Sequence, residues 1–156
     1  MNDIILTGVD GSETAAKAAE VAASLATELK CDLYVISAAD PNQVGLPRFG
    51  RLTSEASARD EMAGRQRAVD AYTRQAQEIA DGVAADLREK FPDLNITSKG
   101  IDKPPASAII DEAASVDPRF VVVGNKHVQG ASRILGSVAT TVARHIKTDL
   151  YIAHTR

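Results

Sequence analysis

The chain alternates between short, continuous runs of apolar residues and longer stretches in which apolar residues recur every three or four positions. Continuous runs are typical of strands that are buried on both faces of a parallel sheet, and the longer spacing is typical of amphipathic helices. We therefore predict strands at 4–9, 33–36, 94–101, 120–123 and 150–153, with helices between them at about 15–29, 69–87, 104–113 and 135–146. This order of elements predicts an α/β fold built on a doubly wound five-stranded parallel sheet with helices on both faces.

The stretch between residues 41 and 68 gives the weakest pattern. Its first part contains Pro41, Gly45, Pro47 and Gly50, which favour a loop. The helical period becomes clear only from Val69 and is stopped by Pro92. The charged residues between 59 and 74 are interpreted as a solvated helix face. The sequence does not indicate whether this loop becomes ordered over a bound ligand.

Length and composition narrow the class of protein. A chain of 156 residues without an internal linker predicts a single domain over 1–156. The net charge of −3 and the isoelectric point near 5.6 argue against a dedicated nucleic-acid binder. There is no apolar run of about 20 residues and no signal-peptide pattern, so we expect neither a membrane segment nor export. Because Cys31 is the only cysteine, an internal disulfide is excluded. We expect a cytoplasmic protein.

Two segments at the ends of predicted strands have the composition of a ligand site. The first is 8–12, Gly-Val-Asp-Gly-Ser, and the second is 124–130, which leads to Gly136 and Ser137 at the last helix. Ligands of such sheets bind at the carboxyl ends of the strands, and free N–H groups at a helix start attract anions. A phosphate is therefore one interpretation. The alternative is that Gly124 only turns the chain and Ser137 only caps a helix.

These segments resemble those of the universal stress protein family. The resemblance rests on the strand followed by Asp10-Gly11-Ser12, on 121–125 (Val-Val-Val-Gly-Asn), and on 135–138 (Leu-Gly-Ser-Val) before the closing strand, and it extends from Ile4 to Ala153. It implies the strand order 3-2-1-4-5, ATP in the crevice between the first and fourth strands, and a homodimer formed through the last strand, Leu150–Ala153. Cyclic AMP or AMP is the alternative ligand, and Mg²⁺ would accompany ATP.

The resemblance also implies roles for individual residues. Gly8, Val9 and Asp10 would lie beside the nucleoside, and Ala38 would line the adenine pocket. The glycine-rich segment would contact ribose and phosphate; its residues are Gly124, Asn125, His127, Gly130, Gly136, Ser137 and Val138. Nucleotide-binding relatives have Gly, two residues, Gly, nine residues and then Gly-Ser/Thr. Here His127 stands at the second glycine, and eight residues separate it from Gly136.

Three functions are compatible with these observations. The favoured one is a dimeric stress-response regulator that binds an adenine nucleotide. The second is a dimeric interaction module of the same family that does not bind nucleotide, which His127 and the shorter spacing would explain. The third is a weak ATPase or autophosphorylating enzyme. We expect no dedicated catalysis, because the sequence offers neither a clear general base nor an acidic metal-binding cluster. Asp10 as a simple helix cap, and His127 as an ordinary loop residue, are the alternatives to functional roles.

Overall fold

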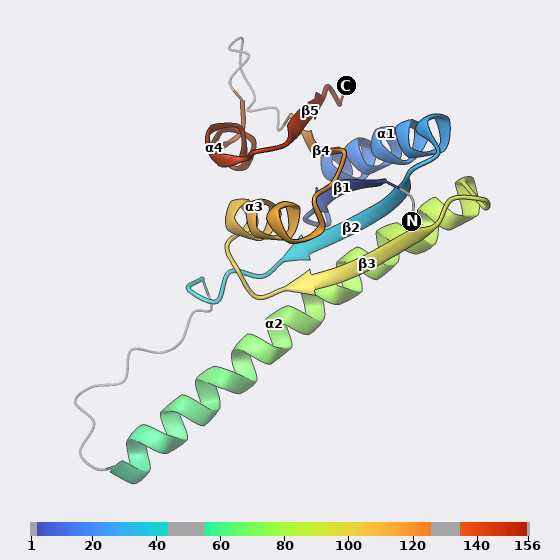
Figure 1. The fold of residues 1–156 in the computed structure, drawn as a ribbon. Coiled ribbons are helices and arrows are strands. Elements are labelled where there is room, and N and C mark those ends of the chain that lie inside the picture. Colours follow the sequence, from blue (N-terminus) through green and yellow to red (C-terminus); the bar gives the residue numbers. More distant parts are fainter. Residues whose placement is uncertain (1–2, 44–54, 126–134, 156) are drawn as a thin grey trace.

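The fold is an alternating series of strands and helices, seen in a computed structural model that describes residues 3–43, 55–125 and 135–155. Figure 1 shows the elements in chain order. Their bounds are β1 (Ile4–Val9), α1 (Glu13–Leu29), β2 (Asp32–Ala38), α2 (Glu55–Lys90), β3 (Ile96–Ile101), α3 (Pro105–Val116), β4 (Phe120–Gly124), α4 (Ser137–His145) and β5 (Asp149–Ala153).

The five strands form one parallel sheet in the order β3-β2-β1-β4-β5. The predicted fold class and strand order are therefore confirmed. Helices α1 and α2 pack on one face of the sheet, and α3 and α4 pack on the other. Since β1 and β4 are neighbours whose chain connections leave in opposite directions, their carboxyl ends meet at the point where the strand order reverses.

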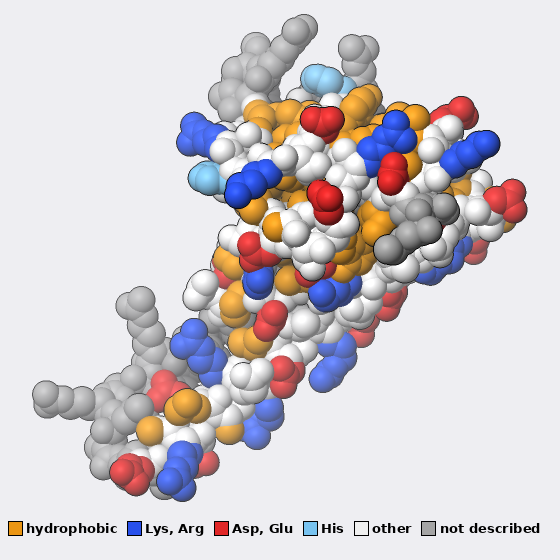
Figure 2. Space-filling view, viewed as in Figure 1, with side chains coloured by type: hydrophobic (Ala, Val, Ile, Leu, Met, Phe, Trp, Pro, Cys, Tyr) orange, Lys and Arg blue, Asp and Glu red, His pale blue; other side chains and the backbone are white. Residues whose placement is uncertain are grey.

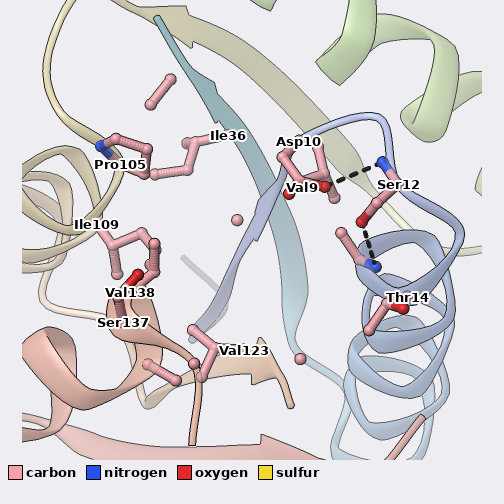
Figure 3. Close-up of a pocket in the computed structure, with 16 residues that line it drawn as sticks. Val9, Asp10, Ser12, Thr14, Ile36, Pro105, Ile109, Val123, Ser137 and Val138 are labelled. Atoms are coloured by element: carbon pink, nitrogen blue, oxygen red, sulfur yellow. Dashed lines mark hydrogen bonds between the residues drawn. The ribbon is translucent and has the colours of Figure 1, made fainter. Parts of the chain in front are cut away.

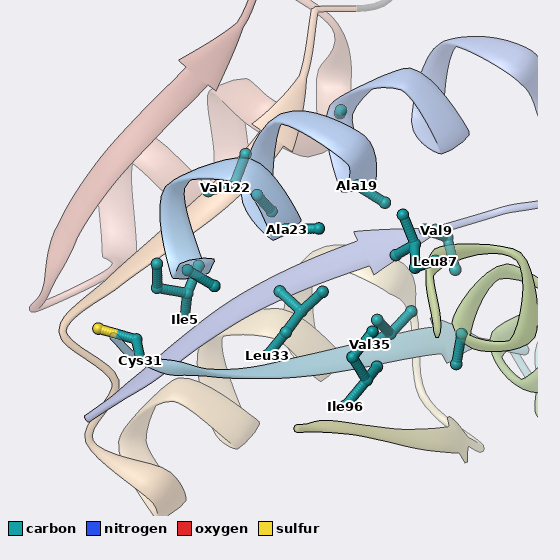
Figure 4. Close-up of a cluster of buried hydrophobic side chains, with 14 of the residues drawn as sticks. Ile5, Val9, Ala19, Ala23, Cys31, Leu33, Val35, Leu87, Ile96 and Val122 are labelled. Carbon is teal, nitrogen blue, oxygen red and sulfur yellow. The ribbon is translucent and has the colours of Figure 1, made fainter. Parts of the chain in front are cut away.

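The two faces of the sheet bury different sets of side chains. On the face of α1 and α2, Ile5, Leu33 and Val35 pack against the alanines of α1 (Figure 4). On the opposite face, Leu6 and Ile36 pack against α3 and α4. Alanine at most buried positions of α1 lets the helix lie close to the strands, because no long side chain separates them. The continuous apolar runs of the sequence are thus explained by burial on both sides.

The predicted start of the second long helix is wrong. The helix was expected from Val69, but α2 begins at Glu55, and its first half projects beyond the sheet (Figure 1). Ala76 is its first buried residue among those whose side chains the structure describes. Before Val69 the apolar positions of this helix are filled only by alanines and Met62, and this pattern was too weak to reveal the first half.

The second half of α2 lies unusually close to β3, and Gly100 makes this possible. A Cβ atom at Gly100 would lie 2.8 Å from the carbonyl oxygen of Thr73 and 2.8 Å from the Cα of Gln77. The Gly100 N–H donates to the Gln77 Oε1 at 2.7 Å, so the same crossing also satisfies a backbone donor. This contact holds the long helix against the edge of the sheet.

Candidate functional site

A cavity of about 170 Å³ opens at the carboxyl ends of β1 and β4. It lies between the sheet, the start of α1, and helices α3 and α4 (Figure 3). The cavity is lined by Gly8, Val9, Asp10, Ser12, Thr14, Ala15, Ile36, Ala38, Pro105, Ile109, Val123, Gly124, Gly136, Ser137, Val138 and Ala139. This is the position at which doubly wound sheets bind their ligands.

The lining is divided into an apolar side and a polar side. Ile36, Pro105 and Ile109 lie together on one side, whereas Asp10 and Thr14 lie on the other (Figure 3). Gly8 of β1 lies beside the apolar side, since a Cβ atom there would come within 3.0 Å of Ile109 Cδ1. Glycine therefore lets the side chain of Ile109 pack directly over the strand, which builds the apolar side of the cavity.

The turn between β1 and α1 is held by its own side chains. The Ser12 N–H donates to Asp10 Oδ1 at 3.0 Å, and the Ala15 N–H donates to Ser12 Oγ at 3.2 Å. Gly11 has φ +80°, which suits glycine. Ser12 is therefore the N-cap of α1, and Asp10 stabilises the turn before it. These hydrogen bonds support the alternative in which Asp10 serves to stabilise the start of α1. Asp10 also lines the cavity.

The start of α4 differs from that of α1, because its N-cap is Gly136 and no side-chain hydrogen bond caps it among the described residues. Gly136, Ser137 and Val138 line the cavity. The first N–H groups of a helix have no partner within the helix, and they carry the positive end of its dipole. This helix start is therefore suited to an anion within the cavity.

The structure brings most of the predicted site residues together. Eight of them line the cavity: Gly8, Val9, Asp10, Ala38, Gly124, Gly136, Ser137 and Val138. Asn125 does not line it. Its N–H donates to the Ala153 carbonyl oxygen at 3.0 Å, and its side chain is buried. His127 and Gly130 lie outside the described residues.

Sequence reasoning missed the apolar side of the cavity. Ile36 could have been found, since it lies two residues before Ala38 and so faces the same side of β2. Pro105 and Ile109 had no such signal. They were interpreted as the start and the inward face of a helix, and only the packing of α3 beside β1 places them at the strand ends.

The groups whose pKa values shift lie away from this cavity. Burial and the neighbouring Glu112 carboxylate raise the pKa of Tyr34, whose hydroxyl donates to Glu112 Oε2 at 2.8 Å. Burial by itself would raise the pKa of Glu112, but hydrogen bonds from Lys99 and Tyr34 hold it below its usual value. This cluster joins β2, β3 and α3, and it is a structural contact. Within the described ranges, no group of three or more histidine, cysteine, aspartate or glutamate residues is arranged to hold a metal ion.

The match to a known family decides the identity of the chain. The family model described as universal stress protein family matches residues 1–154. The chain belongs to the universal stress protein family. The strand order agrees with the fold of its structural neighbours.

Three solved universal stress proteins illustrate the similarity. One, solved in complex with cAMP, is 24% identical, with 99% of this chain and 98% of that chain covered and a TM-score of 0.63. One from Archaeoglobus fulgidus, in complex with dAMP, is 20% identical, with 97% of each chain covered and a TM-score of 0.60. UspA from Lactobacillus plantarum is 17% identical, with 97% of each chain covered and a TM-score of 0.61. At these identities the similarity shows the fold.

No curated protein sequence matches this chain. In the segments that the structure describes, no helix combines the length and apolar character that crossing a membrane requires.

Proposed function

We propose that this universal stress protein binds an adenine nucleotide in the cavity at the ends of β1 and β4 and acts as a dimeric stress-response regulator. The observation that carries the proposal is the start of α4, which no described side chain caps and which lines the same cavity as Ile36, Pro105 and Ile109 on its apolar side. An anion site next to an apolar surface fits a ligand that has a phosphate at one end and a flat base at the other.

Each part of the ligand has a matching part of the cavity. The base would lie against the apolar side, next to Ala38. The ribose hydroxyls would donate to the Asp10 carboxylate, which the turn to Ser12 already orients. The phosphates would accept hydrogen bonds from the N–H groups of Ser137 and Val138 at the start of α4. His127, Gly130 and Asn125 belong to the same proposal only through the resemblance of their segment.

The choice of nucleotide within this proposal is ATP, with AMP or cyclic AMP as alternatives. Structural relatives solved with cAMP and with dAMP support an adenine nucleotide. Mg²⁺ would be held by the phosphates of ATP. The protein's own contribution would be to bind and orient the nucleotide, and we place it in the cytoplasm, where ATP is available.

Isothermal titration with ATP, ADP, AMP and cAMP tests the proposal. We expect Gly136→Val to weaken binding by about tenfold or more, because the added side chain blocks the anion position at the start of α4. Gly64→Val is the matched control, since nothing lies within 4 Å of a Cβ at Gly64 and it is not part of the cavity. If no nucleotide binds the wild-type chain, the alternative holds, and the protein is an interaction module of the same family. His127 and its altered spacing favour that alternative.

Dimerisation through β5 is the second part of the proposal. β5 is the last strand of the sheet, and Tyr151 is 46% exposed. The Ala153 carbonyl accepts from Asn125 in the β4 direction, so the backbone groups of Ile152, one residue away, point outward. An outward row of donors and acceptors can pair with a second β5 across a two-fold axis.

Replacing Ile152 with proline removes an outward donor and leaves the β4 side of the ladder intact. At low micromolar concentration, we expect light scattering to show a monomer for Ile152→Pro and a dimer for the wild-type chain. Ile152→Ala, which keeps the backbone donor at the same position, is the control and should remain dimeric. A wild-type chain that is monomeric at micromolar concentration, with and without nucleotide, contradicts this part of the proposal.

A further inference from the structure

The projecting half of α2 carries an apolar stripe that is only partly buried. Met62 is 72% exposed, and Ala58 and Val69 lie on the same helical face as Met62. Seven-residue steps continue this face to Ala76, which is buried against the sheet. The stripe is therefore an extension of the buried face into solvent (Figure 2). A face of this kind is stabilised when a second apolar surface packs on it.

The charges along the projecting half are divided between its two ends. The first seven residues of α2 contain Glu55, Asp60 and Glu61 against one arginine. Residues 65–74 contain three arginines against one aspartate. Two copies of this helix would bring like charges together in a parallel pair. In an antiparallel pair, the acidic end of each helix lies against the basic segment of the other.

One pair of charged residues gives the alignment. Arg59 and Asp70 are eleven positions apart, which is three helical turns, so they lie on the same flank of the stripe. When two helices are antiparallel and centred near residues 64–66, Arg59 of each copy lies opposite Asp70 of the other. Met62 lies opposite Val69 when the pair is centred at 65.5, one residue from the centre of the charge pair at 64.5. Charge and apolar contact thus agree on the register to within about one residue.

We propose that residues 58–73 of α2 bind a second copy of this chain as an antiparallel helix pair. This interaction goes beyond the proposed nucleotide site and is separate from β5. Helix α2 packs on β2 and β3, at the opposite end of the sheet from β5. With both interfaces present, each copy would bind two others, and the assembly would grow beyond a dimer as concentration rises.

Sedimentation of the Ile152→Pro variant isolates this interface from the β5 interface. We expect that variant to be monomeric at low micromolar concentration and to dimerise as its concentration rises to the submillimolar range. Adding Met62→Glu and Val69→Glu should weaken the association by about tenfold or more, because four carboxylates would be placed within the apolar contact. Ala71→Glu with Gln75→Glu is the matched control, since both residues are exposed and lie away from the stripe. The control should associate as the parent does.

A charge exchange tests the register. Arg59→Asp alone and Asp70→Arg alone should each weaken the pair, and the double exchange should restore it. In a Cys31→Ala background, Gln66→Cys should form an intermolecular disulfide under mild oxidation, because residue 66 lies near the two-fold axis. Ala58→Cys should not, since the two copies of residue 58 would be about 20 Å apart.

Three results would overturn the proposal. The first is a parent variant that remains monomeric throughout the concentration range. The second is an association that the glutamate pair and its control weaken equally. The third is cross-linking of Ala58→Cys as readily as Gln66→Cys, which would show a parallel pair. Circular dichroism of every variant checks that α2 is still folded.

Discussion

The two halves of α2 share one helix and one spacing of apolar residues, yet they lie in opposite environments. From Ala76 to Leu87 the stripe is buried on β2 and β3, whereas from Ala58 to Val69 it is half-buried or exposed. The period of a helix describes which residues share a face. The period does not indicate whether another surface packs against that face. The same spacing of apolar residues therefore occurs on the buried half of α2 and on its exposed half.

The projecting half needs another source of stability. Its residues are mainly good helix formers, such as alanine, glutamate, arginine and glutamine. The Gln66 amide donates to Asp70 Oδ1 at 2.9 Å, one turn away along the exposed surface. The packed half also provides an already formed helix, onto which further turns add without a new nucleation step. The helix propensity of its residues and the helix already formed by the packed half therefore stabilise the projecting half, which burial does not stabilise.

Truncating one large apolar side chain in each half of α2 should give the largest difference in the free energy of unfolding. Leu87 is 2% exposed, so Leu87→Ala should lower the free energy of unfolding by about 3 kcal/mol through lost burial and a residual cavity. Met62→Ala, on the same stripe in the projecting half, should change it by less than about 0.5 kcal/mol. Urea unfolding in the Ile152→Pro background measures both values. Equal losses would mean that the projecting half is packed in solution.

Replacing a glycine with alanine should change the stability of the protein in opposite directions at Gly100 and at Gly64. Gly100→Ala forces the backbone of α2 away from β3, and we expect a loss of about 2 kcal/mol. Gly64→Ala adds the same methyl group where nothing lies within 4 Å, and it should stabilise the helix by about 0.5–1 kcal/mol. Thermal unfolding of the two variants beside the wild-type chain checks the signs. A neutral Gly100→Ala would show that the crossing of α2 over β3 is loose.

A smaller effect should depend on pH. Hydrogen bonds from Ser98 and Gln77 hold the pKa of Asp81, in the packed half, below its usual value. A lowered carboxyl pKa contributes stability above the unfolded-state value, and this contribution is lost as pH falls through the folded-state value. Asp81→Asn should therefore lower Tm at pH 7, and the difference should shrink as the pH falls below the ordinary carboxyl pKa of about 4. A difference that stays constant over this range would assign the effect to packing rather than to charge.

Much of the site could be predicted because its residues follow buried strands. A parallel sheet aligns its strand ends on one edge, so Gly8, Asp10 and Gly124 had to lie near one another once the strand order was known. Gly136 and Ser137 followed from the start of the last helix. Asn125, which the resemblance placed in the glycine-rich segment of the site, is buried, and its N–H donates to the Ala153 carbonyl oxygen. Its direction depends on the neighbouring strand, which the residue's position in the sequence does not indicate.

The sequence by itself determined the type and order of the elements, because the spacing of apolar residues is a local property that each segment carries alone. Only the tertiary structure decided which surfaces those elements cover. It brought Pro105 and Ile109 to the cavity, laid α2 on Gly100, and left Met62 exposed on an otherwise continuous stripe. Each of these outcomes depends on contacts between residues distant in the chain, and such contacts arise only when the sheet and its helices pack together.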